Sequence, residues 1–359
     1  MLKFKKKIIA LYRLIVQFFF KTIYGKIIFK ERILKNNFIK KLKINKKIFG
    51  INYCVYKVKN GRIYTDNSQN VAGIQSNILY GEISFQIKNN KIVNPKYNSA
   101  LTKGTPRFKK EINGTVLSTV QGGSGTNYFH WLFEILPKIR ICKEVRNLKQ
   151  IDYIYVPKYS KSQLETLKLL NIPNKKILKS EKYKHIKAKE LIFTDPPWYT
   201  KGYVHDQAGK IPAWIIFWLK KSFLKFKRKV NYKKKIFVDR TGWWPHCQII
   251  NKKEFENLLM KKNYQICDPA KLDFVEQIYL FWNATHIVGA HGAALSNLVF
   301  CKKETKILEL KPHGHPGKNY QNISKINKLN YRCFTSKKKY LKNKNGDIFI
   351  DLKRISKLI

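Results

Sequence analysis

Short apolar strands alternate with helical patterns through the C-terminal part of the chain. The strand-like segments are KIFVDR (235–240), YQIC (264–267), THIVGA (285–290) and KILEL (306–310). Strands that are apolar along their whole length, and are separated by helices, are typical of a parallel sheet covered on both faces. The pattern therefore predicts an α/β fold with a doubly wound parallel sheet.

Helices are expected between these strands, at 252–263, 274–283 and 294–300. Two of them begin with a capping-box-like pattern, Asn251-x-x-Glu254 and Asp273-x-x-Glu276.

The segment from residue 51 to residue 120 alternates and carries turn signals at Asn60-Gly61, Asn89-Asn90 and Asn113-Gly114, which predicts short strands. A helix with Asn127 as its N-cap follows, then a strand at 151–156, a helix at 162–170 and a strand at 190–194. We expect four parts: a basic extension (1–50), an α/β lobe (51–210), an interlobe helix and linker (211–234) and a second lobe (235–359).

Ligands of parallel sheets bind beyond the carboxyl ends of the strands. His291, Gly292, Ala293 and Ala294 follow the strand at 285–290 and open the next helix. Small residues at a helix start let backbone amides approach a phosphate, and His291 could add a donor. These residues predict a phosphate site.

Two more strand ends carry charged residues. Arg240 follows the first strand, and its forked guanidinium suits phosphate oxygens better than an ammonium group would. Glu309 ends the strand at 306–310, where a carboxylate could accept hydrogen bonds from ribose hydroxyls, and Lys311 comes next.

A candidate general base lies in the first lobe. His130 and Glu134 are four residues apart and share one helix face, so the carboxylate could orient and charge the imidazole. The alternative is structural: His130 caps the first turn of the helix and Glu134 satisfies a buried donor. The glycine-rich segment before them is no P-loop, because no Gly-Lys-Ser/Thr follows.

The net charge and the N-terminal segment both indicate which partners the protein could bind. The chain has 73 Lys and Arg against 22 Asp and Glu, a net +51 that attracts anions, although AT-rich codon bias explains such an excess equally well. Residues 8–20 are apolar, follow a lysine cluster and are too short to span a bilayer. They predict either a helix lying on an anionic membrane surface or an ordinary first helix packed on the protein. Six scattered cysteines indicate reduced thiols in the cytoplasm.

Three stretches together resemble the family 61 glycosyltransferases, whose bacterial members include capsular polysaccharide biosynthesis proteins. They are NYFHWLFEILPKI (127–139), VDRTG…IINKKEF (238–255) and FVEQIYLFWNATHIVGAHGAALSNLVF (274–300), with ILEL (307–310). The resemblance covers residues 110–350. It implies a GT-B-like fold of two Rossmann-like lobes with a cleft between them, inversion at the anomeric carbon, a UDP-sugar donor and neither metal nor other cofactor.

The resemblance also implies roles for residues. Arg240, His291 and Gly292 would face the donor diphosphate, Glu276 and Gln277 would lie along the donor cleft, and His130 with Glu134 would face the acceptor. No Asp-x-Asp, which metal-dependent sugar transferases use, occurs in the sequence.

One departure from the family pattern concerns the phosphate grip. Family members carry basic residues before the IIN segment, where this chain has His246-Cys247-Gln248. Another cation such as Lys311 could replace them, and Trp243-Trp244 could stack on a sugar or base.

We therefore expect an inverting glycosyltransferase that moves a sugar from a nucleotide diphosphate to a glycan or glycolipid acceptor in capsule or lipopolysaccharide synthesis. It would work in the cytoplasm, at the inner face of the plasma membrane if the N-terminus binds lipid. Alternatives are a non-catalytic membrane-associated scaffold of the same fold, a transferase of phosphate esters or phosphoglycerol, and a nucleic-acid-binding protein. The spread of positive charge along the whole chain and the lack of an RNP, KH or zinc motif argue against a nucleic-acid-binding protein.

Overall fold

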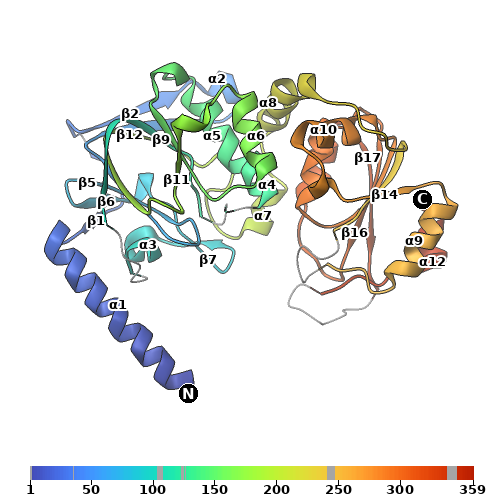
Figure 1. Cartoon of the computed structure of the whole chain (residues 1–359), viewed down its shortest axis with the longest axis horizontal. Helices are drawn as coiled ribbons and strands as arrows, with labels where there is room; N and C mark the ends of the chain where they lie inside the picture. The colour runs from blue at the N-terminus through green and yellow to red at the C-terminus, as the bar shows by residue number, and fades with distance from the viewer. Residues whose placement is uncertain are drawn as a thin grey trace. The chain divides into compact units, whose positions relative to one another are not determined.

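A computed structural model of the chain describes residues 2–34, 36–102, 108–122, 125, 127–240, 247–337 and 346–359. It divides into two compact units (Figure 1). Unit 1 comprises residues 1–160 and 171–204, and unit 2 comprises residues 161–170 and 205–359. The helix at 161–170, expected in the first lobe, thus groups with unit 2, and the basic extension is part of unit 1.

Unit 2 contains a five-stranded sheet in which every pairing is parallel. Its strands are β13 (Lys235–Val238), β14 (Gln265–Cys267), β15 (His286–Ala290), β16 (Lys306–Lys311) and β17 (Asn330–Thr335). They are arranged in the order β14-β13-β15-β16-β17. The predicted parallel sheet is confirmed, and β17 is a further strand that the sequence reading did not include.

Helices cover both faces of this sheet, as a doubly wound fold requires. The helices of this part of the chain are α6 (Lys161–Leu169), α7 (Val204–Ala208), α8 (Ala213–Phe223), α9 (Lys252–Lys261), α10 (Phe274–Asn283), η8 (Ala293–Phe300), α11 (Asn319–Ile326) and α12 (Leu352–Ser356). In Figure 1, α9 and α12 lie to one side of the sheet and α8 and α10 to the other. Short 3₁₀ turns are η6 (Leu224–Phe226) and η7 (Pro269–Lys271).

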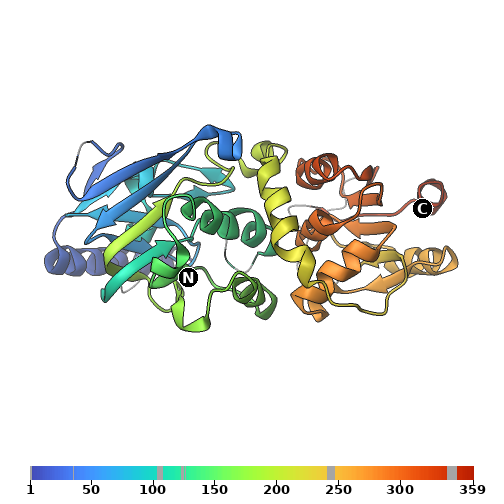
Figure 2. The same ribbon diagram turned by 90° about the horizontal axis from the view of Figure 1, so that it is seen from above.

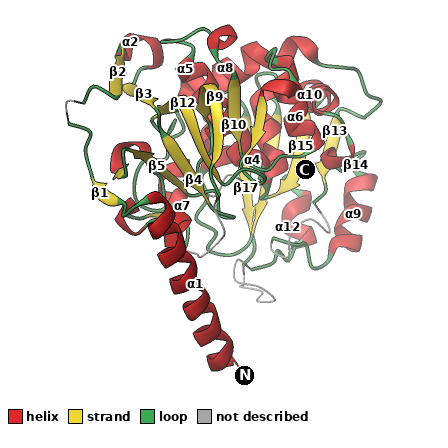
Figure 3. Ribbon diagram, turned by 60° about the vertical axis from the view of Figure 1, so that its left-hand side comes forward, coloured by secondary structure: helices red, strands yellow, loops and turns green. Residues whose placement is uncertain are grey.

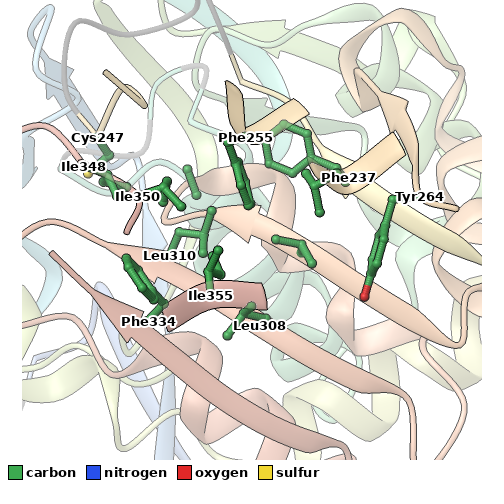
Figure 4. Packing of buried hydrophobic residues seen from close by; sticks show 13 residues of the cluster. Phe237, Cys247, Phe255, Tyr264, Leu308, Leu310, Phe334, Ile348, Ile350 and Ile355 are labelled. Atoms are coloured by element: carbon green, nitrogen blue, oxygen red, sulfur yellow. The ribbon is translucent and has the colours of Figure 1, made fainter. Parts of the chain in front are cut away.

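The core between the sheet and α9 and α12 is built of aromatic and branched side chains (Figure 4). Phe255 of α9 packs edge-to-face on Phe237 of β13, with ring centroids 5.5 Å apart. Leu308, Leu310 and the other members of the cluster are buried. This packing fixes the strands whose carboxyl ends carry the candidate site.

The helix expected at 294–300 is present as the 3₁₀-helix η8. One local expectation in unit 2 needs correction. Asn251 makes no side-chain capping bond at the start of α9. Its amide instead donates to the carbonyl of Ile350 and accepts from the Ile350 amide, so it ties the helix start to the C-terminal segment. The capping box of Asp273 and Glu276 is confirmed.

Unit 1 contains a ten-stranded sheet, coloured blue to yellow-green in Figure 2. Its strands are β1 (Ile28–Lys30), β2 (Ile39–Ile44), β3 (Tyr53–Lys59), β4 (Arg62–Thr65), β5 (Val71–Gln75), β6 (Ile78–Tyr80), β9 (Lys110–Ser118), β10 (Tyr153–Val156), β11 (Ile177–Lys179) and β12 (His185–Thr194). The order is β1-β6-β5-β4-β12-β9-β10-β11, with β3 pairing β12 and β2. A separate hairpin joins β7 (Ile87–Lys88) and β8 (Lys91–Ile92).

The sheet of unit 1 is mixed, and only its part from β9 to β12 has the parallel pairing of a Rossmann-like lobe, so the expected two-lobe GT-B arrangement stays a prediction. Strands β9, β10, β11 and β12 pair in parallel among themselves, whereas β12 pairs antiparallel with β3 and β4, and β4 pairs antiparallel with β5. Asn89 and Asn90 adopt positive φ angles in the two-residue turn of the β7–β8 hairpin. Asn60 also has a positive φ angle, but β3 and β4 on either side of it both pair antiparallel with β12, so the chain does not reverse there.

The turn expected at Asn113-Gly114 is also wrong. Both residues lie inside β9, where the register against β12 shifts by one residue. They therefore form a β-bulge, and a side chain at Gly114 would lie 2.8 Å from Asp152.

The helices of unit 1 are α1 (Leu2–Tyr24), α2 (Lys46–Phe49), α3 (Ser99–Thr102), α4 (Tyr128–His130), the π-helical turn η3 (Trp131–Ile135) and α5 (Leu136–Cys142). Its 3₁₀ turns are η1 (Gly81–Ile83), η2 (Pro95–Tyr97), η4 (Leu148–Gln150) and η5 (Asn174–Lys176). Within the described ranges, none of the helices combines the length and hydropathy that a membrane-spanning segment needs.

Candidate functional site

The strand order of unit 2 creates a switch point between β13 and β15. The chain leaves β13 toward β14 on one side and then crosses to β15 on the other, and such a reversal is where ligands of open α/β sheets bind. Val238 of β13 is paired with Gly289 of β15. Arg240 and His291 each come two residues after this pair, so they meet at the same edge of the sheet.

Arg240 lies across the backbone that follows β15. Its Nη1 donates a hydrogen bond to the carbonyl oxygen of His291. A Cβ atom on Gly292 would be 2.8 Å from Nη1 and 3.0 Å from Cζ of Arg240. The absence of a side chain at position 292 therefore lets the guanidinium lie against the main chain.

Gly292 lies against this guanidinium, and Ala293 and Ala294 follow it as the first residues of η8. All three residues are half-buried, and none of the described residues accepts a hydrogen bond from their amides. The amide of His291 is different, because it donates to Leu310 of β16. The arrangement offers N–H groups and one guanidinium to an anion, which is the chemistry expected from the sequence.

His291 is held by Glu309. Its Nδ1 lies 2.5 Å from Oε1 of the carboxylate, which is fully buried in β16. The hydroxyl of Tyr331 donates to Oε2, and burial, followed by the charge of Glu309, raises the pKa of that phenol. Both oxygens of Glu309 thus have protein partners. We assign Glu309 to orienting His291 rather than to a ribose.

A loop after β16 supplies residues that the sequence reading missed. The ring of His315 lies 4.0 Å from that of His291 between centroids, and Tyr320 lies on another side at 5.1 Å. A Cβ on Gly317 would be 2.9 Å from both imidazoles, so this glycine permits their close packing. The motif Pro-His-Gly-His-Pro-Gly directly follows a strand end, and the strand-end argument could have found it.

Lys311 does not replace the basic residues that family members carry before the IIN segment. It is buried, and its Nζ donates to the carbonyl of Gly317 at 2.5 Å and lies 3.5 Å from Oε2 of Glu309. It therefore fixes the loop from inside. Cys247 is also fully buried, in the core cluster, and the backbone N–H of Gln248 donates a hydrogen bond to the side chain of Asp347. His246 and Trp243-Trp244 lie outside the described residues.

Glu276 and Gln277 make structural contacts at the start of α10. Glu276 accepts a hydrogen bond from the Asp273 amide in the capping box and forms an ion pair with Arg228 at 2.9 Å. The side chain of Gln277 accepts from Asn297 of η8 at 3.0 Å. The structure does not bring either residue into the cluster around Arg240 and His291. Their role along the donor cleft stays a prediction.

In unit 1, His130 and Glu134 are paired as the spacing suggested, with Nδ1 2.7 Å from Oε1. Asn127 is the N-cap and accepts from the amides of Phe129 and His130, so Asn127 and not His130 caps the helix. The other part of the structural alternative is confirmed, because Glu134 accepts a hydrogen bond from the buried side chain of Gln121 at 3.4 Å. Glu134 is fully buried, whereas 16% of the His130 side chain is exposed. The carboxylate thus orients an imidazole that solvent can reach.

A π-helical turn begins directly after His130 and contains Glu134. The amide of Leu136 donates to the carbonyl of Trp131, five residues back. Pro137 follows and has no amide hydrogen for the ladder, which explains why the helix widens here. Turns of this kind are frequent at functional sites.

The carboxylate of Glu134 acts on the pKa of His130. Burial lowers the pKa of His130, but the charge of Glu134 and the hydrogen bond to it outweigh burial, and the pKa is raised above its ordinary value. Lys138 is buried nearby with its Nζ 3.1 Å from the carbonyl of Val120. Burial lowers the pKa of this amine to about 8, against the opposing charges of Glu134 and Asp195.

Among the residues that the structure describes, no three His, Cys, Asp or Glu side chains are grouped so that they could hold a metal ion. The lining of a small cavity beside Arg240 contains no group of three such side chains either. It is lined by Phe237, Val238, Asp239, Arg240, Cys247, Gln248, Ile249, Lys252 and Ala290.

Comparison with known proteins identifies the family of the chain. No curated protein matches the chain. The family model described as Glycosyltransferase 61 matches residues 128–308, which is half of the sequence and spans His130, Glu134, Arg240 and His291. The chain belongs to glycosyltransferase family 61.

Proposed function

We propose that this protein transfers a sugar from a nucleotide diphosphate, UDP in the first place, to a glycan or glycolipid acceptor with inversion at the anomeric carbon. A glycosyltransferase needs a donor and an acceptor. We assign the donor to unit 2 and the acceptor to unit 1, as the two lobes of a GT-B enzyme that requires no metal.

The observation that carries the proposal is the meeting of Arg240, His291 and Gly292 at the switch point of the parallel sheet. A guanidinium and the amides at the start of η8 would neutralise the charge that develops on the leaving diphosphate. Such preorganised donors stabilise a transition state because they need no rearrangement as charge appears. Glu309 supports this by fixing the ring of His291.

We assign the general base to His130. Its pairing with buried Glu134 leaves the imidazole partly exposed and fixes which nitrogen faces the carboxylate. In the proposed reaction the imidazole takes the proton of an acceptor hydroxyl as that oxygen attacks the anomeric carbon from the face opposite the diphosphate. A positioned base contributes typically 10²–10⁴-fold to such a step.

The biological setting we propose is the synthesis of capsule or lipopolysaccharide in the cytoplasm. The six cysteines are all free thiols, as expected in a reducing compartment. The resemblance to bacterial capsular proteins supports the acceptor class.

Calorimetry tests the donor site. We expect UDP to bind the wild-type protein and Arg240→Ala to weaken binding roughly 10–100-fold, because a charge-assisted hydrogen bond is lost. Arg332→Ala is the matched control, since this arginine is exposed on β17 in the same sheet. Equal UDP affinity in Arg240→Ala and Arg332→Ala would contradict the proposal.

Three further assays of the wild-type protein distinguish the remaining alternatives. Release of UDP from a UDP-sugar excludes the non-catalytic scaffold. Binding of duplex DNA that falls steeply with salt, without any effect of UDP, would favour the nucleic-acid-binding protein. Transfer from a phosphoglycerol donor but from no nucleotide sugar would favour the phosphate-ester alternative.

A further inference from the structure

Within the residues that the structure describes, helix α1 contacts the rest of unit 1 through its C-terminal part, from Gln17 to Tyr24. Tyr24 contacts the ring of His185 at 5.1 Å between centroids, and its hydroxyl accepts a hydrogen bond from the Lys109 amide at 3.0 Å. Phe20 packs edge-to-face on Phe108 at 5.5 Å. Figures 1 and 3 show the helix projecting from its unit, with the N-terminus farthest away. The N-terminal turns therefore present their side chains to the surroundings.

The projecting turns expose large apolar side chains in one stripe. The members of this stripe are Phe4, Ile8, Leu11, Ile15 and Phe18, between 52% and 73% exposed. Spacings of four and three residues place them on one face of the helix. An exposed apolar face of this size marks a binding surface, because soluble surfaces rarely carry one.

The charge of α1 has a single sign. Lys6 and Arg13 are seven residues apart, lie on the face opposite the stripe and are exposed. Lys5, Lys7 and Lys21 add to them, and the first acidic residue of the chain is Glu31. A partner for this helix should therefore be both apolar and negatively charged.

We propose that α1 binds the surface of an anionic lipid bilayer, with the stripe from Phe4 to Phe18 inserted between headgroups and the basic residues in contact with lipid phosphates. Peripheral binding requires two signals, apolar insertion and a polybasic patch, and α1 carries both. The helix has 23 residues, about 35 Å in length, and lies in the plane of the interface.

A second copy of the chain is the other partner that an apolar stripe could take. Two α1 helices side by side would bring together only positive charges, with no acidic residue in either helix to offset them. Like charges at a helix–helix contact are destabilising. The charge pattern thus favours lipid, and this inference does not depend on the reaction that the protein catalyses.

Co-sedimentation of the full chain with vesicles tests the proposal. We expect binding to phosphatidylcholine vesicles with about a third phosphatidylglycerol, and at least tenfold weaker binding to pure phosphatidylcholine. Leu11→Glu combined with Ile15→Glu should lower binding to the anionic vesicles tenfold or more. The matched control, Phe217→Glu combined with Met260→Glu, makes the same change of charge at side chains that are equally exposed in unit 2 and should bind like wild type.

Each contrary result is decisive. The proposal is overturned if the Leu11 and Ile15 variant binds the vesicles like wild type, or if the control variant loses as much binding as that variant. It is also overturned if the wild type does not bind the anionic vesicles. Sedimentation velocity without vesicles adds one more outcome. A dimer that the α1 variant loses and the control keeps would assign the stripe to a second copy instead. Equal melting temperatures of the variants show that the result does not come from unfolding.

Discussion

Glu309 and His291 join two neighbouring strands through a buried carboxylate–imidazole contact, with Oε1 2.5 Å from Nδ1. Glu309 lies on β16, and His291 directly follows β15. The backbone pairing of these strands places Gly289 beside Glu309. The orientation of the imidazole is therefore set by the sheet and does not depend on a flexible loop.

Replacing Glu309 by Gln tests whether this contact positions His291. The amide keeps the shape of the carboxylate but not its charge, so the ring is held less firmly, and we expect UDP affinity to fall about tenfold. Tyr331→Phe removes the hydrogen bond to the other oxygen and should have a smaller effect. Calorimetry measures the affinity, and the ¹⁵N shifts of His291 report the tautomer. Unchanged shifts in Glu309→Gln would show that the carboxylate does not position the ring.

Gly292→Ala tests the close approach of Arg240. The new methyl group would lie 2.8 Å from Nη1, and the guanidinium can move aside because it ends a flexible side chain. We therefore expect an unchanged melting temperature and UDP affinity weakened roughly tenfold. Gly209→Ala is the control, since its Cβ would meet only Lys318 at 3.5 Å. The same affinity in both variants would argue against a donor site at this turn.

The cluster around Arg240 could be predicted because strand ends are visible in sequence. Apolar runs ending in Arg240 and His291 show where each strand stops, and a parallel sheet brings such ends to one edge. The sequence does not show what a side chain contacts after folding. Glu309 was therefore expected to face a ribose, although tertiary packing turns it toward His291 and Tyr331.

Unit 1 was harder to predict because its signals are local. Asn60-Gly61 and Asn113-Gly114 both look like turns in sequence, yet neither reverses the chain: β3 and β4 on either side of the first pair with β12, and the second is a bulge inside β9. Long-range pairing with β12 decides both outcomes, and that pairing is not visible in the residues themselves. The π-helical turn at Trp131 was missed for the same reason, although Pro137 was a signal that the helix would deviate.

The pH dependence of the reaction tests His130 as the base. The imidazole must be neutral to accept a proton, so the rate should fall as the pH drops through the raised pKa of His130. In Glu134→Gln the carboxylate charge is lost and burial remains, which should move this acid limb to lower pH and reduce the maximal rate. Initial rates of sugar transfer against pH measure both effects.

Truncation of the His130 side chain completes the test of this residue as the base. His130→Ala should lower the transfer rate roughly 10²–10⁴-fold and leave UDP affinity within a few-fold. His286→Ala, at the opposite end of β15 from the donor cluster, is the control and should transfer normally. Normal transfer by His130→Ala would move the base to another residue.

The stability of the fold should report the buried amine of Lys138. Its pKa is lowered from the ordinary 10.5 to about 8 by burial, only partly offset by Glu134 and Asp195. Between these values the unfolded chain binds more protons than the folded one, so the contribution of Lys138 to the free energy of unfolding rises with pH, by at most about 3 kcal/mol. Lys138→Met has no such titration. The difference between wild type and variant in urea unfolding should therefore change across this pH range, and a constant difference would mean that the folded protein keeps this amine protonated.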